Sequence, residues 1–213
     1  MTLQMPSSSP SGSGEPRALK QDRAYRTRRH VLRAAAEMFA EHGYANTSIT
    51  GIAEHIGMTK GAVYFHYRNK DAMAVEVVQD AYRIWGALTE EVTAESRDPA
   101  ASIMTLPDRT VRTFLDDVIV QAGSPLQAER SLIDARLPEP YVGWTNRLAQ
   151  LFDQAAEAGN LRTGVTPRAA ATVVVAAVFG MQHISDVPHQ RRDLSERWGE
   201  VRAVLVETLL TAR

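Results

Sequence analysis

Residues 59–62, Thr-Lys-Gly-Ala, set one cation among small side chains. The Thr59 hydroxyl can accept a hydrogen bond from a backbone N–H that the first turn of a helix leaves unpaired, so a helix is predicted to begin here. Small residues at its tip let the backbone approach a DNA groove closely, where Lys60 can reach a guanine edge or a phosphate. Side chains suited to phosphate contacts follow at Tyr64, His66, Tyr67, Arg68 and Lys70. The pattern predicts a nucleic-acid interface on one short helix.

Two short helices that meet at a sharp turn would position these side chains. The apolar stripe of the first helix comprises Ile49, Ile52, Ala53 and Ile56, and that of the second comprises Ala62, Val63 and Phe65. Gly57 lies between them, where a left-handed backbone would penalise any Cβ. This is a helix-turn-helix signature. Similar helix pairs occur in all-α proteins that bind no DNA, so the local pattern leaves DNA binding and simple packing both open.

The preceding segment adds a third helix and a concentration of positive charge. Residues 26–42 repeat apolar side chains at helical spacing and are followed by Gly43, a typical helix-ending residue. Residues 20–70 contain nine Lys and Arg against four Asp and Glu, a net charge of +5, whereas residues 71–213 contain fourteen against twenty, a net charge of −6. The total of −1 therefore combines a basic head with an acidic body, which favours DNA binding by the head.

Residues 34–73 resemble the N-terminal domain of the tetracycline-repressor (TetR) family of transcriptional regulators. The matching positions are Phe39, Gly43, Tyr44, Thr47, Ile52 with Ala53, Gly57, Lys60 with Gly61, Tyr64 with Phe65, and Lys70 with Asp71. The resemblance implies that Thr47 caps the second helix and touches a phosphate. It also implies that a groove-facing set comprises Thr59, Lys60, Gly61 and Ala62, and that a backbone-clasping set comprises Tyr64, His66 and Lys70. Thr47 and Thr59 would serve as caps in any protein, but Lys60 and Lys70 have no evident packing role, which favours DNA contacts for them.

We expect three parts: a disordered tail at residues 1–19, a helix-turn-helix DNA-binding domain at residues 20–70, and a ligand-binding and dimerisation domain at residues 71–213. Residues 1–16 are rich in Ser, Gly and Pro, with little to bury. Residues 17–29 can be a basic arm that follows DNA, or solvated charge. The sequence shows no secretory signal and no run near the roughly 20 apolar residues of a membrane span, so a cytoplasmic protein without membrane contact is expected. The absence of cysteine excludes disulfides.

The body reads as all-α. Asn69 or Asp71 can cap a long helix that joins head to body, and Pro107 is expected to begin or kink a helix that reaches Val118. Further helices are predicted at residues 125–137, 142–158, 167–184 (after a cap at Thr166) and 194–210. Residues 169–179 are so apolar that they must be covered almost all round, yet they are too short and alanine-rich for a membrane. They are therefore expected at the centre of the body or in a subunit interface. The TetR resemblance implies that the last two long helices form a four-helix homodimer contact, which would set two recognition helices about 34 to 36 Å apart on a palindromic operator.

Residues 135–152 resemble the γ-butyrolactone autoregulator receptor branch of the family, which implies that Trp144 lines a ligand pocket. Other candidates from helix spacing are Trp85 and Tyr82 as walls, Phe114 and Val118 from the middle helix, and Thr172 and Gln182 as polar anchors. Core packing is the alternative role for these six. We expect a dimeric repressor that a small signalling molecule, such as a γ-butyrolactone or a related furan or butenolide, releases from DNA. The alternative is a regulator that responds to an antibiotic or another drug-like compound.

No catalytic constellation, metal site or cofactor is expected. The six histidines are scattered, and the sequence lacks a GxSxG elbow, a glycine-rich phosphate loop and an HExxH pair. The neighbouring carboxylates Asp116 and Asp117, like Glu90 and Glu91, diverge across a helix surface and cannot share one site. The sequence therefore favours a binding protein over an enzyme.

Overall fold

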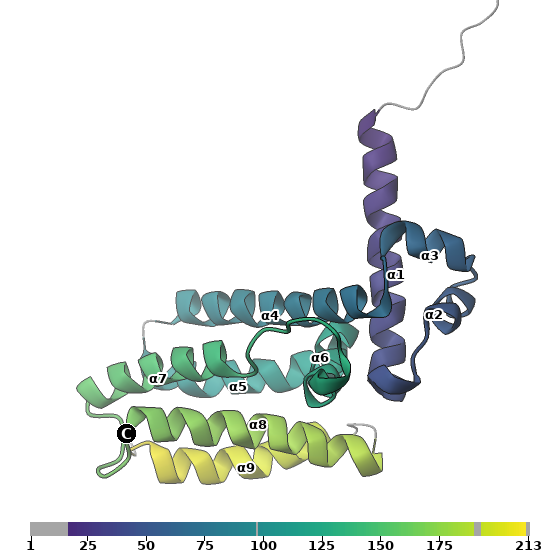
Figure 1. The fold of residues 1–213 in the computed structure, drawn as a ribbon. Coiled ribbons are helices and arrows are strands. Elements are labelled where there is room, and N and C mark those ends of the chain that lie inside the picture. Colours follow the sequence, from purple (N-terminus) through teal and green to yellow (C-terminus); the bar gives the residue numbers. More distant parts are fainter. Residues whose placement is uncertain (1–16, 97, 190–192, 212–213) are drawn as a thin grey trace, which may run out of the picture.

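The computed structural model describes residues 17–96, 98–189 and 193–211. Within these residues the chain is all-α, as predicted, with one isolated β-bridge between Leu161 and Leu210. The elements are α1 (Arg17–Asn46), α2 (Ile49–His55), α3 (Lys60–His66), α4 (Lys70–Glu95), α5 (Pro99–Asp116), α6 (Val118–Ala128), the 3-10 helix η1 (Arg130–Leu132), α7 (Val142–Glu157), α8 (Pro167–His189) and α9 (Leu194–Leu209). The three N-terminal helices form a head, and the others form an elongated body beside it (Figure 1).

The head is built on α1, whose apolar face is fully buried at Val31, Leu32, Ala35 and Phe39. The helix begins at Arg17, three residues before the predicted start of the head, and its first turns project beyond α2 and α3 (Figure 1). Residues 17–19, predicted as part of the tail, are therefore helical. The rest of that predicted tail, residues 1–16, lies outside the described residues.

Local capping explains where α2 and α3 begin. Ser48 caps α2 by accepting a hydrogen bond from the Gly51 N–H at 3.0 Å, and Thr59 caps α3 by accepting from the Ala62 N–H at 3.2 Å. Gly57 takes a φ of 64° at the turn between them, as predicted. The prediction that Thr47 caps α2 is wrong. Its hydroxyl donates to the Gly43 carbonyl at 2.8 Å and to the Met38 carbonyl at 3.2 Å, so it serves the end of α1 instead.

The long helix α4 runs from the head into the body and contributes to both hydrophobic cores. Asn69 caps it by accepting from the Ala72 N–H at 2.9 Å. Near its start, Met73 and Val77 lie in the core of the head, whereas Trp85 and Val92, further along, lie in the core of the body. A movement of this helix is thus shared by both parts of the molecule.

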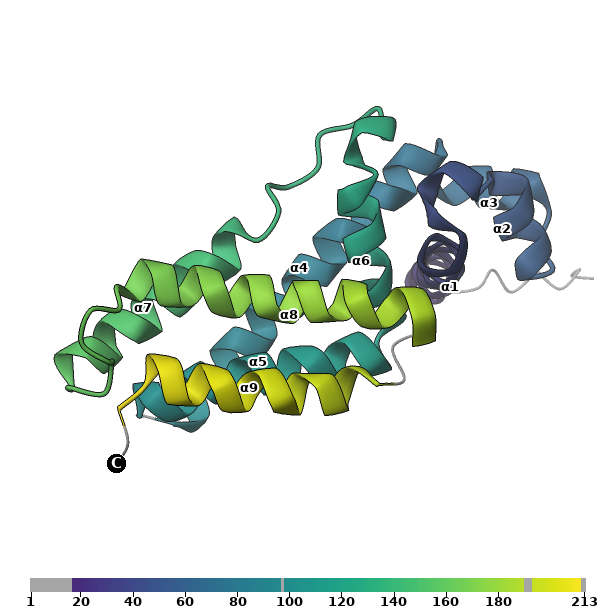
Figure 2. The ribbon, with the colours of Figure 1, turned by 90° about the horizontal axis from the view of Figure 1, so that it is seen from below.

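Two predicted helices in the middle of the chain have different boundaries. Pro107 lies buried inside α5, and Asp117 starts a separate helix, α6, by accepting from the Ile119 N–H at 2.8 Å. Val118 therefore begins α6. The prediction that it belongs to the same helix as Pro107 is wrong. The predicted helix over residues 125–137 is also wrong, because α6 ends at Ala128. The residues after η1 leave helical geometry and run to α7 as an irregular chain (Figure 2).

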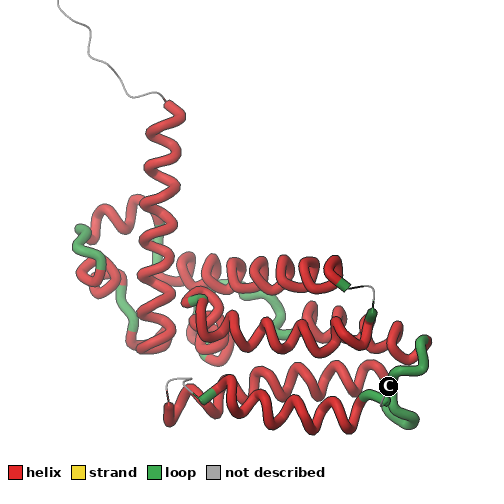
Figure 3. The backbone as a smooth tube through the Cα atoms, turned by 180° about the vertical axis from the view of Figure 1, so that it is seen from behind, coloured by secondary structure: helices red, strands yellow, loops and turns green. Residues whose placement is uncertain are grey.

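The last three helices have the predicted positions, but one face of α8 and α9 stays uncovered. The buried side of α8 includes Ala171, Val174 and Val178, whereas Val173 and Ile184 are 47 % and 51 % exposed, and Val204 on α9 is 60 % exposed. Figure 3 shows α8 and α9 side by side along one edge of the body. Within a single chain, residues 169–179 are thus covered on one side only, so of the two predicted locations a subunit interface remains and the centre of the body does not.

The prediction that this apolar stretch is too short to cross a membrane is wrong, because it is part of a longer helix. Among the described helices, Pro167–Ser185 has the length and the apolar composition needed to cross a membrane. The core helix of a soluble protein can have the same length and composition. Its buried side packs against α7, α5 and α9.

Gly43→Ala tests how closely head and body are docked. Gly43 has φ 75° and ψ 172°, a conformation essentially restricted to glycine, and a Cβ there would lie 2.5 Å from the Glu129 Oε1 atom. We expect this change to lower the free energy of unfolding by roughly 2 to 3 kcal/mol in urea denaturation. Gly57→Ala is the matched control, because its Cβ would have no neighbour within 4 Å, and about 1 kcal/mol is expected. Equal losses in the two variants would contradict the close approach of Glu129.

Candidate DNA interface and ligand cavity

The tip of α3 presents the predicted groove-facing residues. Thr59, Lys60 and Gly61 are exposed, Ala62 is half-buried, and a Cβ at Gly61 would have no neighbour within 4 Å. The Lys60 Nζ atom lies 5.8 Å from the centre of the Tyr64 ring, within range of a cation–π interaction. Among the described residues, Lys60 has no carboxylate partner within 4.0 Å. A small, open helix tip with one uncommitted cation suits close approach to a groove.

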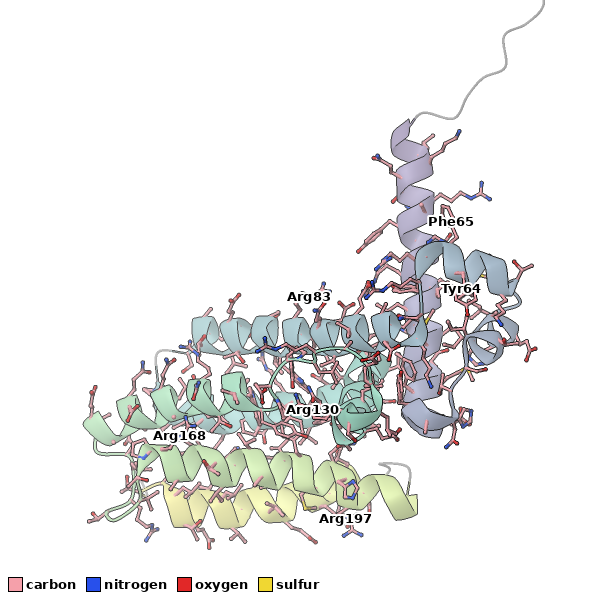
Figure 4. All side chains as sticks on the ribbon, in the orientation of Figure 1. Tyr64, Phe65, Arg83, Arg130, Arg168 and Arg197 are labelled. Carbon is pink, nitrogen blue, oxygen red and sulfur yellow. The ribbon has the colours of Figure 1, made fainter. Side chains whose placement is uncertain are left out.

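Two aromatic side chains extend this surface. Tyr64 is 46 % exposed and Phe65 is 81 % exposed, and Phe65 projects from α3 away from the body (Figure 4). Phe65 was predicted in the apolar stripe of this helix, but Val63 and Tyr67, four residues apart, take the buried positions. That spacing leaves Phe65 on the outer face, a signal the sequence did contain. A large exposed apolar ring on the same helix as Lys60 suits contact with a thymine methyl group.

The other three predicted DNA contacts lie nearer the core. Thr47 is only 2 % exposed. His66 is half-buried, and its carbonyl accepts a hydrogen bond from Arg28 Nη1 at 2.7 Å. Lys70 Nζ donates to the Tyr44 carbonyl at 2.7 Å and lies 3.9 Å from the centre of the Tyr44 ring, where burial lowers the pKa of the lysine. Lys70 thus has a structural role that the sequence did not reveal.

Part of the positive charge of the head holds the head to α4. Arg28 pairs with Glu76, and Arg29 pairs with the buried carboxylate of Asp80. The Arg28 guanidinium also lies 4.2 Å from the centre of the Tyr67 ring. These two arginines are therefore engaged within the molecule, and the exposed cations Lys60 and Arg68 remain near the DNA-facing surface.

The body contains a cavity of about 590 Å³ between α4, α7, α8 and the chain before α7. Its walls include Tyr82 and Trp85 from α4, Tyr141 and Trp144 from the start of α7, and Phe179 from α8. The Phe179 ring centre lies 4.4 Å from that of Tyr141 and 5.6 Å from that of Trp144, so the rings form one contiguous aromatic wall. A cavity of this size and lining suits a small, partly apolar molecule.

Two buried polar atoms beside this wall have no hydrogen-bond partner among the described residues: Trp144 Nε1 and Gln127 Oε1. The amide nitrogen of Gln127 donates to the Tyr82 Oη atom at 2.8 Å and to the Pro138 carbonyl at 3.1 Å. Gln127 lines a small annex of about 20 Å³ that shares Tyr82, Trp85 and Phe179 with the main cavity. One buried donor and one buried acceptor next to the wall are therefore unused within the described residues.

The predicted pocket residues divide into two groups. Trp144, Trp85 and Tyr82 line the main cavity, and Phe114 lines the annex. The other three predictions are not at this cavity: Val118 and Gln182 line a separate groove between α1, α6 and α8, and Thr172 is exposed, with its hydroxyl donating to the Arg168 carbonyl. Helix spacing identifies the inner face of a helix but not the neighbour it meets. Sequence reasoning missed Tyr141 and Phe179, although Tyr141 is part of the Pro-Tyr stretch that suggested the pocket.

Comparisons with known proteins now agree with this geometry. Residues 31–77 match the model of bacterial regulatory proteins, tetR family. A solved structure described as the molecular basis for control of antibiotic production by a bacterial hormone is 47 % identical, with a TM-score of 0.79, covering 87 % of this chain and 98 % of the other. The chain belongs to the TetR family.

Two further relatives of this TetR-family chain come from Streptomyces. The A-factor receptor protein of Streptomyces griseus is 27 % identical over 186 residues, which cover 85 % of this chain and 64 % of the relative, just under two thirds of its length. CprB from Streptomyces coelicolor, solved in complex with its biological operator sequence, has a TM-score of 0.80 at 22 % identity, with 89 % and 91 % of the two chains covered. At that identity CprB supports the fold alone.

Lys60→Ala tests the DNA interface of this TetR-family head. We expect operator affinity to fall about tenfold, because a groove or phosphate contact is lost, while the melting temperature stays unchanged. Fluorescence anisotropy with labelled operator DNA measures the first quantity and calorimetry the second. Arg112→Ala, which removes an exposed cation from α5, is the matched control. Equal losses of affinity in the two variants would mean that only overall charge matters.

Proposed function

We propose that this chain is a dimeric transcriptional repressor that binds operator DNA through α3 and is released by a small signalling molecule in the body cavity. The observation that carries the proposal is the aromatic cavity beside α4, with a buried indole N–H that lacks a partner. The helix α4 lines this cavity and also joins the core of the head. The helix α4 thus connects the proposed ligand cavity to the DNA-binding head. As a DNA-binding regulator, the protein works in the cytoplasm.

The polar atoms of the cavity indicate the chemistry of the ligand. A buried polar group without a partner costs about 1 to 3 kcal/mol, which a ligand can recover by supplying the missing bond. A ligand carbonyl would accept from Trp144 Nε1, and a ligand hydroxyl would donate to Gln127 Oε1. A γ-butyrolactone, or a related furan or butenolide, combines such groups with an apolar chain. The similarity to the A-factor receptor protein, and to a protein through which a bacterial hormone controls antibiotic production, supports this class.

The exposed face of α8 and α9 supports the dimer. Val173, Ile184 and Val204 are each about half exposed or more, and a second copy of the same face would cover them. Twofold symmetry would then present two α3 helices to successive major grooves of a palindromic operator, about 34 to 36 Å apart. A single head would make half of these contacts.

A mobility shift on DNA from upstream of the gene tests the proposed function. The probes are an alkyl γ-butyrolactone, an alkyl furan and an alkyl butenolide of matched chain length, with ethidium as a drug-like cation. Release by one of the first three supports the proposal. Release by ethidium alone would favour a regulator of drug-like compounds, and the absence of any shift would contradict DNA binding.

Trp144→Phe tests the unused donor. We expect the probe concentration for half-release to rise about tenfold, because the indole N–H is removed. The phenyl ring is smaller than the indole, but no internal hydrogen bond is lost, so the free energy of unfolding should fall by less than in Trp198→Phe. Trp198→Phe is the matched control, since the Trp198 Nε1 atom donates to Asp108 Oδ1 at 2.7 Å. That change should lower the free energy of unfolding by about 1 kcal/mol and leave release unchanged. An unaltered release curve for Trp144→Phe would exclude the indole from ligand binding.

A further inference from the structure

The segment between α6 and α7, residues 129–141, shares a hydrophobic cluster with α1 of the head and also lines the cavity. We call it the connecting segment. Its buried side chains Ile133 and Leu137 lie in the same hydrophobic cluster as Val31 and Phe39 of α1. Its last residues, Pro138, Glu139 and Tyr141, line the cavity. A short stretch of chain therefore touches both places that a ligand response must connect, and Figure 2 shows it running from the end of α6 to α7.

Two carboxylates fix the connecting segment and the end of α1 to each other. Glu129 Oε2 accepts a hydrogen bond from the Ala45 N–H at 2.9 Å. Asp71, in the first turn of α4, accepts at Oδ1 from the Tyr44 hydroxyl at 2.5 Å and from the Asp134 N–H at 3.0 Å. The Tyr44 hydrogen bond lowers the pKa of Asp71, so this carboxylate is ionised at neutral pH. One Asp71 oxygen thus joins α1, α4 and the connecting segment.

The other end of the connecting segment is fixed to the cavity wall. The Pro138 carbonyl accepts from Gln127 Nε2 at 3.1 Å, and the Glu139 carbonyl accepts from the Tyr82 hydroxyl at 3.5 Å. Tyr141 has a φ of 62°, a left-handed conformation that is unfavourable for a residue with a side chain, and its ring packs on Phe179. A ligand that displaces these residues must also displace a chain whose other end is held at Asp71 and Glu129.

We propose that Asp71 is a positioning residue through which the connecting segment passes ligand occupancy to the DNA-binding head. Asp71 touches neither the cavity nor the exposed surface of α3, so it acts only through the groups it joins. The inference rests on the proposed function. It differs from a signal carried by α4 alone, because a break at the Asp71 carboxylate leaves α4 continuous and removes only its links to Tyr44 and to the Asp134 N–H.

Asp71→Ala, which removes the accepting oxygen, and Tyr44→Phe test this route in the full-length dimer. The probe is whichever γ-butyrolactone, furan or butenolide releases the wild-type protein. Three dissociation constants are measured: that of operator DNA without the probe, that of operator DNA with the probe, and that of the probe on free protein. The last is measured by tryptophan fluorescence. The ratio of the two operator constants is the coupling factor, commonly between about 5 and 150. We expect it to fall at least about fivefold towards one in both variants, while probe affinity on free protein stays within about twofold.

Asp134→Ala is the matched control, because it removes a side chain of the connecting segment but keeps the N–H that Asp71 accepts. Its coupling factor should equal that of the wild type. A wild-type coupling factor in Asp71→Ala and Tyr44→Phe would overturn the inference, and so would a loss of probe affinity on the free variants. Should Asp71→Ala fail to fold, Tyr44→Phe decides alone, since it removes one hydroxyl. If no probe releases the wild-type protein, the proposed function falls together with the inference.

Discussion

The end of α1 is held by two carboxylates from outside the head, Asp71 at the start of α4 and Glu129 after α6. Glu129 accepts from the Ala45 N–H and Asp71 accepts from the Tyr44 hydroxyl, while Lys70 donates to the Tyr44 carbonyl. Gly43 makes this docking possible, because its positive φ turns the chain and its missing side chain leaves room for Glu129. The orientation of α2 and α3 follows from this junction, since Thr47 ties the start of α2 to the same turn.

Charge in the head serves two separate purposes. Arg28 and Arg29 form ion pairs with Glu76 and Asp80 of α4. These ion pairs hold α1 against α4. Lys60 has no carboxylate partner among the described residues and lies at the tip of α3, 5.8 Å from the centre of the exposed Tyr64 ring. The net charge of the head is therefore a poor measure of its DNA surface. Exposure and the absence of a carboxylate partner distinguish the cations available for DNA from those that hold the fold.

The helices and the turn of the head could be predicted from local sequence rules. Long-range packing limited the prediction of the cavity residues. Thr59 and Gly57 act through their own backbone, so capping and turn rules suffice for them. Ser48 and Thr47 carry adjacent hydroxyls, and only the nearby carbonyls of α1 decide which one caps α2. The all-α body could likewise be predicted from its periodicity. The cavity could be predicted only at Trp144, Trp85 and Tyr82, because the meeting of α8 with α7 brings in Phe179 and excludes Thr172, a fact no single helix pattern contains.

The distance between the two heads of the dimer tests the central claim most directly. The chain has no cysteine, so Glu54→Cys on the exposed side of α2 gives one spin label per subunit. Pulsed electron paramagnetic resonance then measures the label-to-label distance with and without the probe that releases operator DNA. A ligand acting through the junction must shift the main distance, because the heads move relative to the bodies that hold them. Identical distance distributions, with the probe shown to be bound, would contradict the account.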